Sequence, residues 1–116
     1  MSHLNAPMIA SPPGLRLELP LERLAEFCRR WSITRLEIFG SAIGDGFSQD
    51  SDVDLLATYA PSAHWSLLDR VRMKHELETL LGREVDLLNR RALEKGRANQ
   101  RSAAILAQAE VLYAES

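Results

Sequence analysis

The sequence has only one cysteine, few aromatic residues, no long apolar run and no excess of positive charge. The single cysteine, Cys28, excludes an intramolecular disulfide and is typical of proteins in a reducing compartment. A formal net charge of −2 argues against sequence-independent binding of nucleic acid, which requires a basic surface. No apolar stretch approaches the length of a membrane span, and no basic segment followed by an apolar one opens the chain. These absences predict a cytoplasmic protein that binds no membrane and makes no direct contact with nucleic acid.

What is present is the composition of one ordinary folded domain. The 116 residues are 46% hydrophobic and 26% charged, which is sufficient for a single modest core. Residues 1–14 carry Ser, Asn, Pro and Gly without periodicity, so we predict a flexible N-terminal tail there. Residues 15–116 are predicted to form the domain itself.

The spacing of apolar residues indicates alternating helices and strands. Helices are predicted at 21–31, 64–82 and from about 97 to 113. Strands are predicted at 35–39, 52–59 and 83–89, with a polar bridge at 90–100. The apolar side of the long helix is expected to include Leu68, Val71, Leu77, Leu80 and Leu81, and Tyr113 is expected near an exposed end of the chain. This order predicts an α/β (α+β) fold with one small sheet flanked by helices.

Three aspartates are predicted to meet at one rim of this sheet. A strand, a long helix and a second strand are typical of a parallel pair, whose strands start at the same end. Asp52 and Asp54 open the first strand, and Asp86 lies early in the second. If the strand ending at Phe39 runs antiparallel to the first, Gly40 and Ser41 arrive at the same rim, and the sheet is mixed.

These acids are candidates for a metal site, although Asp-x-Asp by itself is common in turns and helix caps. Residues two apart in a strand point to one face, so Asp52 and Asp54 could bracket a divalent ion. Aspartate is unfavourable inside otherwise apolar strands, yet "VDLL" occurs at both Val53 and Val85. Asp86 would complete an oxygen cluster that suits Mg²⁺, and without a metal at least one carboxyl pKa should rise.

Gly40 and Ser41 are candidates for phosphate binding. Glycine after a strand permits a sharp turn and a close approach to a ligand, and Ser41 offers a hydroxyl and an N–H at the start of a helical turn. Alone, the Gly-Ser pair indicates only a turn. Facing a rim of carboxylates, it indicates a site for attack on a nucleoside triphosphate.

Gly40-Ser41, nine residues, and then Ser51-Asp52-Val53-Asp54-Leu55 resemble the signature of the minimal nucleotidyltransferases of the DNA polymerase β superfamily. The similarity extends through "IFGSAIGDGF", "HELETLLGREVDLLN" and "AILAQAEVLYAE", from about Leu15 to Glu115. Within the superfamily it is most similar to the MNT antitoxins, whose gene partners are HEPN-domain ribonuclease toxins.

The resemblance implies a polymerase β-like fold and a role for each motif residue. Asp52, Asp54 and Asp86 would be catalytic and bind Mg²⁺, with Asp86 assisting deprotonation of the attacking hydroxyl. Gly40 and Ser41 would hold the triphosphate of ATP. The implied activity is transfer of AMP from ATP to a tyrosine of the HEPN toxin, which would be silenced by the modification and by binding.

The loop after Ser41 departs from the family pattern. Members carry Arg or Lys there, whereas "AIGDGFSQD" contains no base and has acids at Asp45 and Asp50. A cation at this place would neutralise charge on the triphosphate. Substitutes by charge alone are Arg70, Arg72, Lys74, Arg97 and Arg101.

Three functions therefore remain open. The intact acids favour an active enzyme that modifies a protein. The base-free loop favours an antitoxin that neutralises its toxin by binding alone. A nucleotidyltransferase acting on a small molecule or an RNA end is the third.

Overall fold

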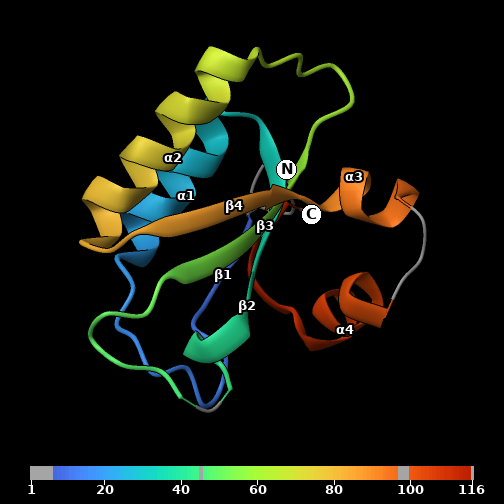
Figure 1. The fold of residues 1–116 in the computed structure, drawn as a ribbon. Helices are drawn as coiled ribbons and strands as arrows, with labels where there is room; N and C mark the ends of the chain where they lie inside the picture. Colours follow the sequence, from blue (N-terminus) through green and yellow to red (C-terminus); the bar gives the residue numbers. More distant parts are fainter. Residues whose placement is uncertain (1–6, 45, 97–99, 116) are drawn as a thin grey trace.

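The computed structural model describes residues 7–44, 46–96 and 100–115. Within them, five strands form one sheet in the order β1-β5-β2-β3-β4 (Figure 1). The strands are β1 (Met8–Ile9), β2 (Ile33–Phe39), β3 (Val53–Tyr59), β4 (Val85–Asn89) and β5 (Glu110–Ala114). The helices are α1 (Leu21–Arg30), α2 (Leu67–Leu81), α3 (Arg90–Lys95) and α4 (Gln100–Gln108), with one 3₁₀ turn, η2 (Gly40–Ala42).

The sheet is mixed, as predicted. β3 and β4 run parallel on either side of the α2 crossover, with Asp54 opposite Asp86 in the register. β2 pairs antiparallel with β3 and places Phe39 opposite Asp54. The end of β2 and the starts of β3 and β4 therefore share one rim, and the predicted α/β class with a small mixed sheet is confirmed.

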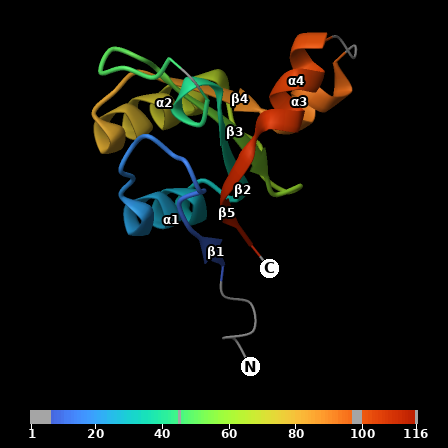
Figure 2. The same cartoon turned by 90° about the horizontal axis from the view of Figure 1, so that it is seen from below.

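The helices cover the two faces of the sheet in pairs. α1 and α2 lie on one face, and α3 and α4 lie on the other (Figures 1 and 2). The main core lies between the sheet and the first pair, and includes Leu24, Phe27, Ile38, Leu55, Met73, Leu77 and Leu112. On the opposite face Phe39 and Leu56 are also buried. This second face carries the aspartate rim.

The ends of α2 agree with the sequence, but part of its apolar side was predicted wrongly. Ser66 accepts a hydrogen bond from the Asp69 N–H at 3.1 Å in a capping box, and Gly82 ends the helix in the left-handed conformation. Leu77 is fully buried, whereas Leu68 is 60% and Val71 is 43% exposed. At about 100° per residue, Leu68 lies on the side of α2 opposite the buried line through Met73 and Leu77. Val71 lies at the flank of the helix, where it borders a cavity beside β4.

Two short elements were not predicted. Met8 and Ile9, placed in the predicted tail, pair with Ala114 and Tyr113 of β5. The supposed polar bridge contains α3, whose first turn is capped by the Asn89 side chain accepting from the Arg91 and Ala92 N–H groups. β1 depends on a partner at the other end of the chain, which local composition does not reveal.

The predicted last helix was too long. α4 ends at Gln108, and residues 110–114 form β5, which lies between β1 and β2. The start of the prediction, 97–99, lies outside the described residues. Tyr113 was expected near an exposed end but is 1% exposed. The short apolar run in "EVLYA" fits a strand as well as a helix, and the free edge of β2 decides between them.

No helix among the described residues combines the length and apolar character that crossing a bilayer would require.

Candidate active site

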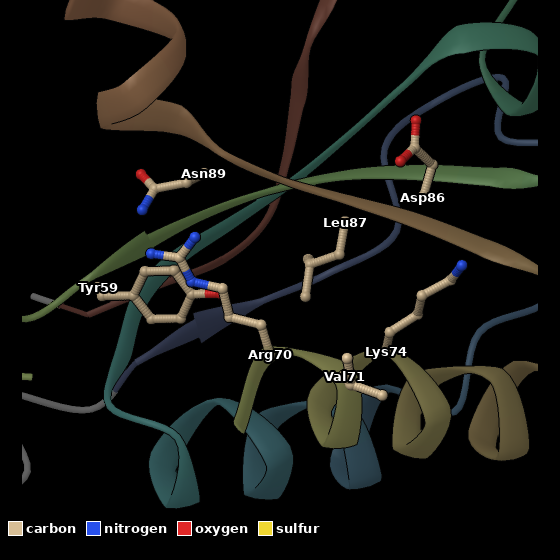
Figure 3. Close-up of a pocket in the computed structure, with 7 residues that line it drawn as sticks. All are labelled: Tyr59, Arg70, Val71, Lys74, Asp86, Leu87 and Asn89. Atoms are coloured by element: carbon tan, nitrogen blue, oxygen red, sulfur yellow. The ribbon is translucent and has the colours of Figure 1, made fainter. Parts of the chain in front are cut away.

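Two of the three predicted aspartates, Asp54 and Asp86, lie side by side on the face covered by α3 and α4, and Asp52 directly precedes β3. Asp54 and Asp86 lie opposite each other on parallel strands, so their side chains leave the sheet on the same side. Asp54 is half-buried, while Asp52 and Asp86 are exposed. Figure 3 shows Leu87 directed toward α2 and the Asp86 carboxylate directed to the other side of β4. The predicted convergence of β3 and β4 acids is thus present.

The rim is electrostatically strained in the absence of a cation. Burial raises the pKa of the Asp54 carboxyl, and the negative charges of Asp86 and Asp52 raise it further. The positive charge of Arg101 acts in the opposite direction. The expected rise of at least one carboxyl pKa is confirmed, and a bound cation would relieve the repulsion that causes part of it.

The donors suit Mg²⁺, although they do not form a closed protein cage. Among the described residues, no three His, Cys, Asp or Glu side chains are gathered closely enough to hold a metal ion on their own. Mg²⁺ commonly takes one or two carboxylates and completes its shell with water and substrate phosphates. The facing pair Asp54 and Asp86, with Asp52 at the entrance of β3, fits that mode of binding.

Gly40 makes the corner beside these acids and cannot be replaced without a collision. Its φ angle is +79°, a conformation that side-chain-bearing residues rarely adopt. A Cβ atom at this position would overlap the Asp54 carboxylate oxygen Oδ2. The N–H groups of Ile43 and Gly44 donate to the Gly40 carbonyl at 3.2 and 3.1 Å, and so close the η2 turn that contains Ser41. Gly40 and Ser41 therefore reach the predicted rim.

Two residues outside the motifs hold this corner. The Gly40 N–H donates to Oε1 of Gln108, at the end of α4, over 3.1 Å. Arg16 donates from Nε to the Gly44 carbonyl over 2.9 Å. Neither was found from the sequence, because each contact joins segments far apart in the chain. The only indication of the Gln108 contact in the sequence was that the last predicted helix carries polar residues.

The start of α3 is anchored on the same face by a buried ion pair. Arg90 donates from Nη1 to both carboxylate oxygens of Glu37 at 2.8 Å. Glu37 is 2% exposed, so removing either partner would leave an uncompensated buried charge. This pair fixes the first turn of α3 directly after β4, the strand that carries Asp86.

The structure separates the cations considered as substitutes for the missing loop base. Arg70 and Lys74 rise from α2 into a cavity of about 220 Å³ that Asp86 and Leu87 also line, although the Asp86 carboxylate is directed to the other side of β4 (Figure 3). Arg72 is an exposed residue of the same helix, and Arg97 lies outside the described residues. Arg101 lies on α4, on the face of the aspartates, and lines a second cavity of about 650 Å³.

Comparisons with known proteins agree with this geometry. A family model described as a nucleotidyltransferase domain matches residues 21–109. A protein of Methanocaldococcus jannaschii, described as a protein adenylyltransferase, is 45% identical over 56 residues, or 48% of this chain and 58% of that protein. Protein adenylyltransferase MntA of Thermococcus cleftensis is 34% identical over 71 residues, or 61% of this chain and 70% of that protein. The chain thus spans less than two thirds of the first relative.

Solved structures share the fold. A structure described as a minimal nucleotidyltransferase is 34% identical, with a TM-score of 0.59 over 77% of this chain and 85% of that one. A toxin–antitoxin crystal structure with AMP-PNP is 18% identical, with a TM-score of 0.61 over 80% of this chain and 72% of that one. A structure of a tri-AMPylated Shewanella oneidensis HEPN toxin in complex with MNT antitoxin is 17% identical, with a TM-score of 0.53 over 80% of this chain and 68% of that one. The chain belongs to the nucleotidyltransferase domain family.

Proposed function

We propose that this protein transfers AMP from ATP to a tyrosine of a partner HEPN ribonuclease toxin, and that this transfer neutralises the toxin in the cytoplasm. The observation that carries the proposal is the contact of the Gly40 corner with Asp54, which faces Asp86 across two parallel strands. Two relatives described as protein adenylyltransferases and the likeness to an MNT antitoxin bound to an AMPylated HEPN toxin support it.

The residues of the rim and corner have separable tasks in this reaction. Gly40 and Ser41 would hold the triphosphate against the corner, because glycine leaves the backbone open to a close ligand. Asp52, Asp54 and Asp86 would hold Mg²⁺, which when bound neutralises charge on the transferring phosphoryl group. Asp54 sits deepest, between the corner and β4, and therefore sets the distance between phosphates and acids.

The acceptor would enter from the exposed side of Asp86. The tyrosine hydroxyl oxygen bonds to the α-phosphorus of ATP, the bond from that phosphorus to the bridging oxygen of the β-phosphate breaks, and pyrophosphate leaves. Asp86 accepts the hydroxyl proton and passes it to water. Its exposure allows a protein-borne tyrosine to approach, which a buried base would not.

The base-free loop favours a second candidate function. Residues 41–51 contain no Lys or Arg, and they carry Asp45 and Asp50. If no other group compensates for this, ATP would bind weakly, and the protein would neutralise the toxin by covering it without modifying it.

One experiment separates the two functions. The protein is incubated with its neighbouring gene product, Mg²⁺ and ATP labelled at the α-phosphate, alongside an Asp52→Asn, Asp54→Asn double variant. Asp50→Asn serves as the matched control, since it removes an exposed acid of the same loop. Label on the partner that is lost in the double variant and kept in the control supports the enzyme. A tight complex without label, unaffected by any variant, supports binding alone.

A further inference from the structure

A triphosphate bound at the Gly40 corner needs positive groups that the adjoining loop does not supply. Residues 41–51 contribute only the negative charges of Asp45 and Asp50. The phosphates of ATP carry several negative charges, and their positioning for transfer depends on donors and cations close to the phosphate oxygens. These groups must therefore come from another element.

We propose that α4 supplies them, with the Gln108 carboxamide donating to the phosphates and the Arg101 guanidinium neutralising their charge. This inference rests on the proposed function, because it names the residues that hold the triphosphate at the same site. In this proposal α4 lines the nucleotide site and supplies the positive charge that the loop lacks.

The orientation of Gln108 follows from its contact with Gly40. The Gly40 N–H is a donor, so the atom that receives it at 3.1 Å must be the carbonyl oxygen Oε1. The Nε2 atom then faces the loop, 3.4 Å from the point where a Cβ on Gly44 would stand. Two N–H donors are therefore fixed beside the corner that would receive the phosphates.

Arg101 lies on the same side of α4, two turns earlier. Seven residues separate it from Gln108, which is about 10.5 Å along the helix axis. Arg101 lines the 650 Å³ cavity together with Leu88 of β4 and Ile105 of α4. It forms no ion pair within the part of the chain that the structure describes. An exposed cation that borders open space on the face of the aspartates is suited to neutralise a polyanion bound on that face.

The other nearby cations are engaged or misplaced. Arg16 donates to the Gly44 carbonyl and thereby braces the loop backbone. Arg70 and Lys74 rise from α2 into a cavity that Asp86 also lines, but the Asp86 carboxylate is directed away from them, to the other side of β4 (Figure 3). Arg83 donates to the Ser48, Gln49 and Ser51 carbonyls and is thus engaged with the loop backbone. Arg101 lies on the face of the aspartates and borders open space.

The test measures binding of ATP and of AMP, each with Mg²⁺, by isothermal titration calorimetry. Arg101→Ala removes the cation, and Gln108→Glu keeps an acceptor for the Gly40 N–H while replacing the two donors with negative charge. Arg72→Ala is the control, since it removes an exposed cation on the opposite face. Gly44→Arg, added to Arg101→Ala, places a cation in the loop itself. Denaturant midpoints confirm that each variant is folded.

We expect Arg101→Ala and Gln108→Glu each to weaken ATP binding by about 10- to 100-fold, the usual range for a charge-assisted contact. AMP binding should change less than about 3-fold, because AMP lacks the β- and γ-phosphates. Gly44→Arg should restore most of the lost ATP affinity, and the control should match the unsubstituted protein.

Two results would overturn the inference. In the first, Arg101→Ala and Gln108→Glu bind ATP as tightly as the control, while the Asp52→Asn, Asp54→Asn variant no longer binds it. This result would refute the role of α4 but leave the proposed function standing. The second is equal loss of ATP and AMP binding in the α4 variants, which assigns these residues to the nucleoside. Absence of ATP binding by the unsubstituted protein would overturn the proposed function as well.

Discussion

Replacing Gly40 with alanine should abolish AMP transfer while leaving most of the fold intact. The substitution forces a residue with a side chain to adopt φ +79°, which costs about 1–2 kcal/mol. In addition, the new methyl group would overlap Asp54 Oδ2, so the carboxylate must move away from its place opposite Asp86. Because misplacement of a catalytic group by about 1 Å can cost 100-fold in rate, we expect at least that loss.

Gly14 provides a matched control for this prediction. It has the same φ of +79°, but a Cβ at Gly14 would meet no atom within 4 Å. Gly14→Ala should therefore lose a similar amount of stability in urea denaturation and keep its transfer rate. If Gly40→Ala transferred AMP as fast as Gly14→Ala, the Gly40 corner would not set the position of Asp54, and the reasoning would be refuted.

Three further predictions concern the core and the pH dependence of stability. Leu77→Ala should lower the free energy of unfolding by about 2–5 kcal/mol, and Leu68→Ala by less than about 0.5 kcal/mol; equal urea midpoints would contradict the assigned faces of α2. Burial raises the pKa of the Cys28 thiol to about 12, so a thiol reagent at pH 8 should label it only as the protein unfolds; labelling without denaturant would show that Cys28 is accessible. Asp54 has a raised pKa in the folded state, so its contribution to stability falls as pH rises from 3.8 through the folded pKa. Without Mg²⁺, the free energy of unfolding of Asp54→Asn minus that of the unsubstituted protein should therefore be larger at pH 7 than at pH 3.5. An equal difference at the two pH values would contradict this.

The acidic rim could be predicted from sequence because it depends on local rules. Alternation within a strand places Asp52 and Asp54 on one side, and the long helix between two strands makes them parallel. Parallel pairing then brings Asp86 beside Asp54 without any knowledge of the rest of the chain. Gly40 follows from the same argument, since an antiparallel β2 must end at the same rim.

The parts that sequence missed depend on contacts between distant segments. Val111 and Tyr113 continue an apolar pattern that fits both a helix and a strand, and only the open edge of β2 selects the strand. The sequence shows Gln108 only as a polar residue near a helix end. Its importance comes from the hydrogen bond that its side chain accepts from the Gly40 N–H. Leu68 fits the apolar pattern of α2, but which side of that helix meets the sheet is set by packing.

The position of β5 gives the site a dependence on the completed fold. Its pairings join Met8 to Ala114 and Leu36 to Tyr113, so the sheet closes through contacts of very high sequence separation, a kind of contact that slows folding. Gln108 lies immediately before this strand and reaches Gly40 only once β5 has docked. A chain in which β5 has not docked would hold Asp54 and Asp86 on β3 and β4 yet lack the Gln108 contact at the Gly40 corner.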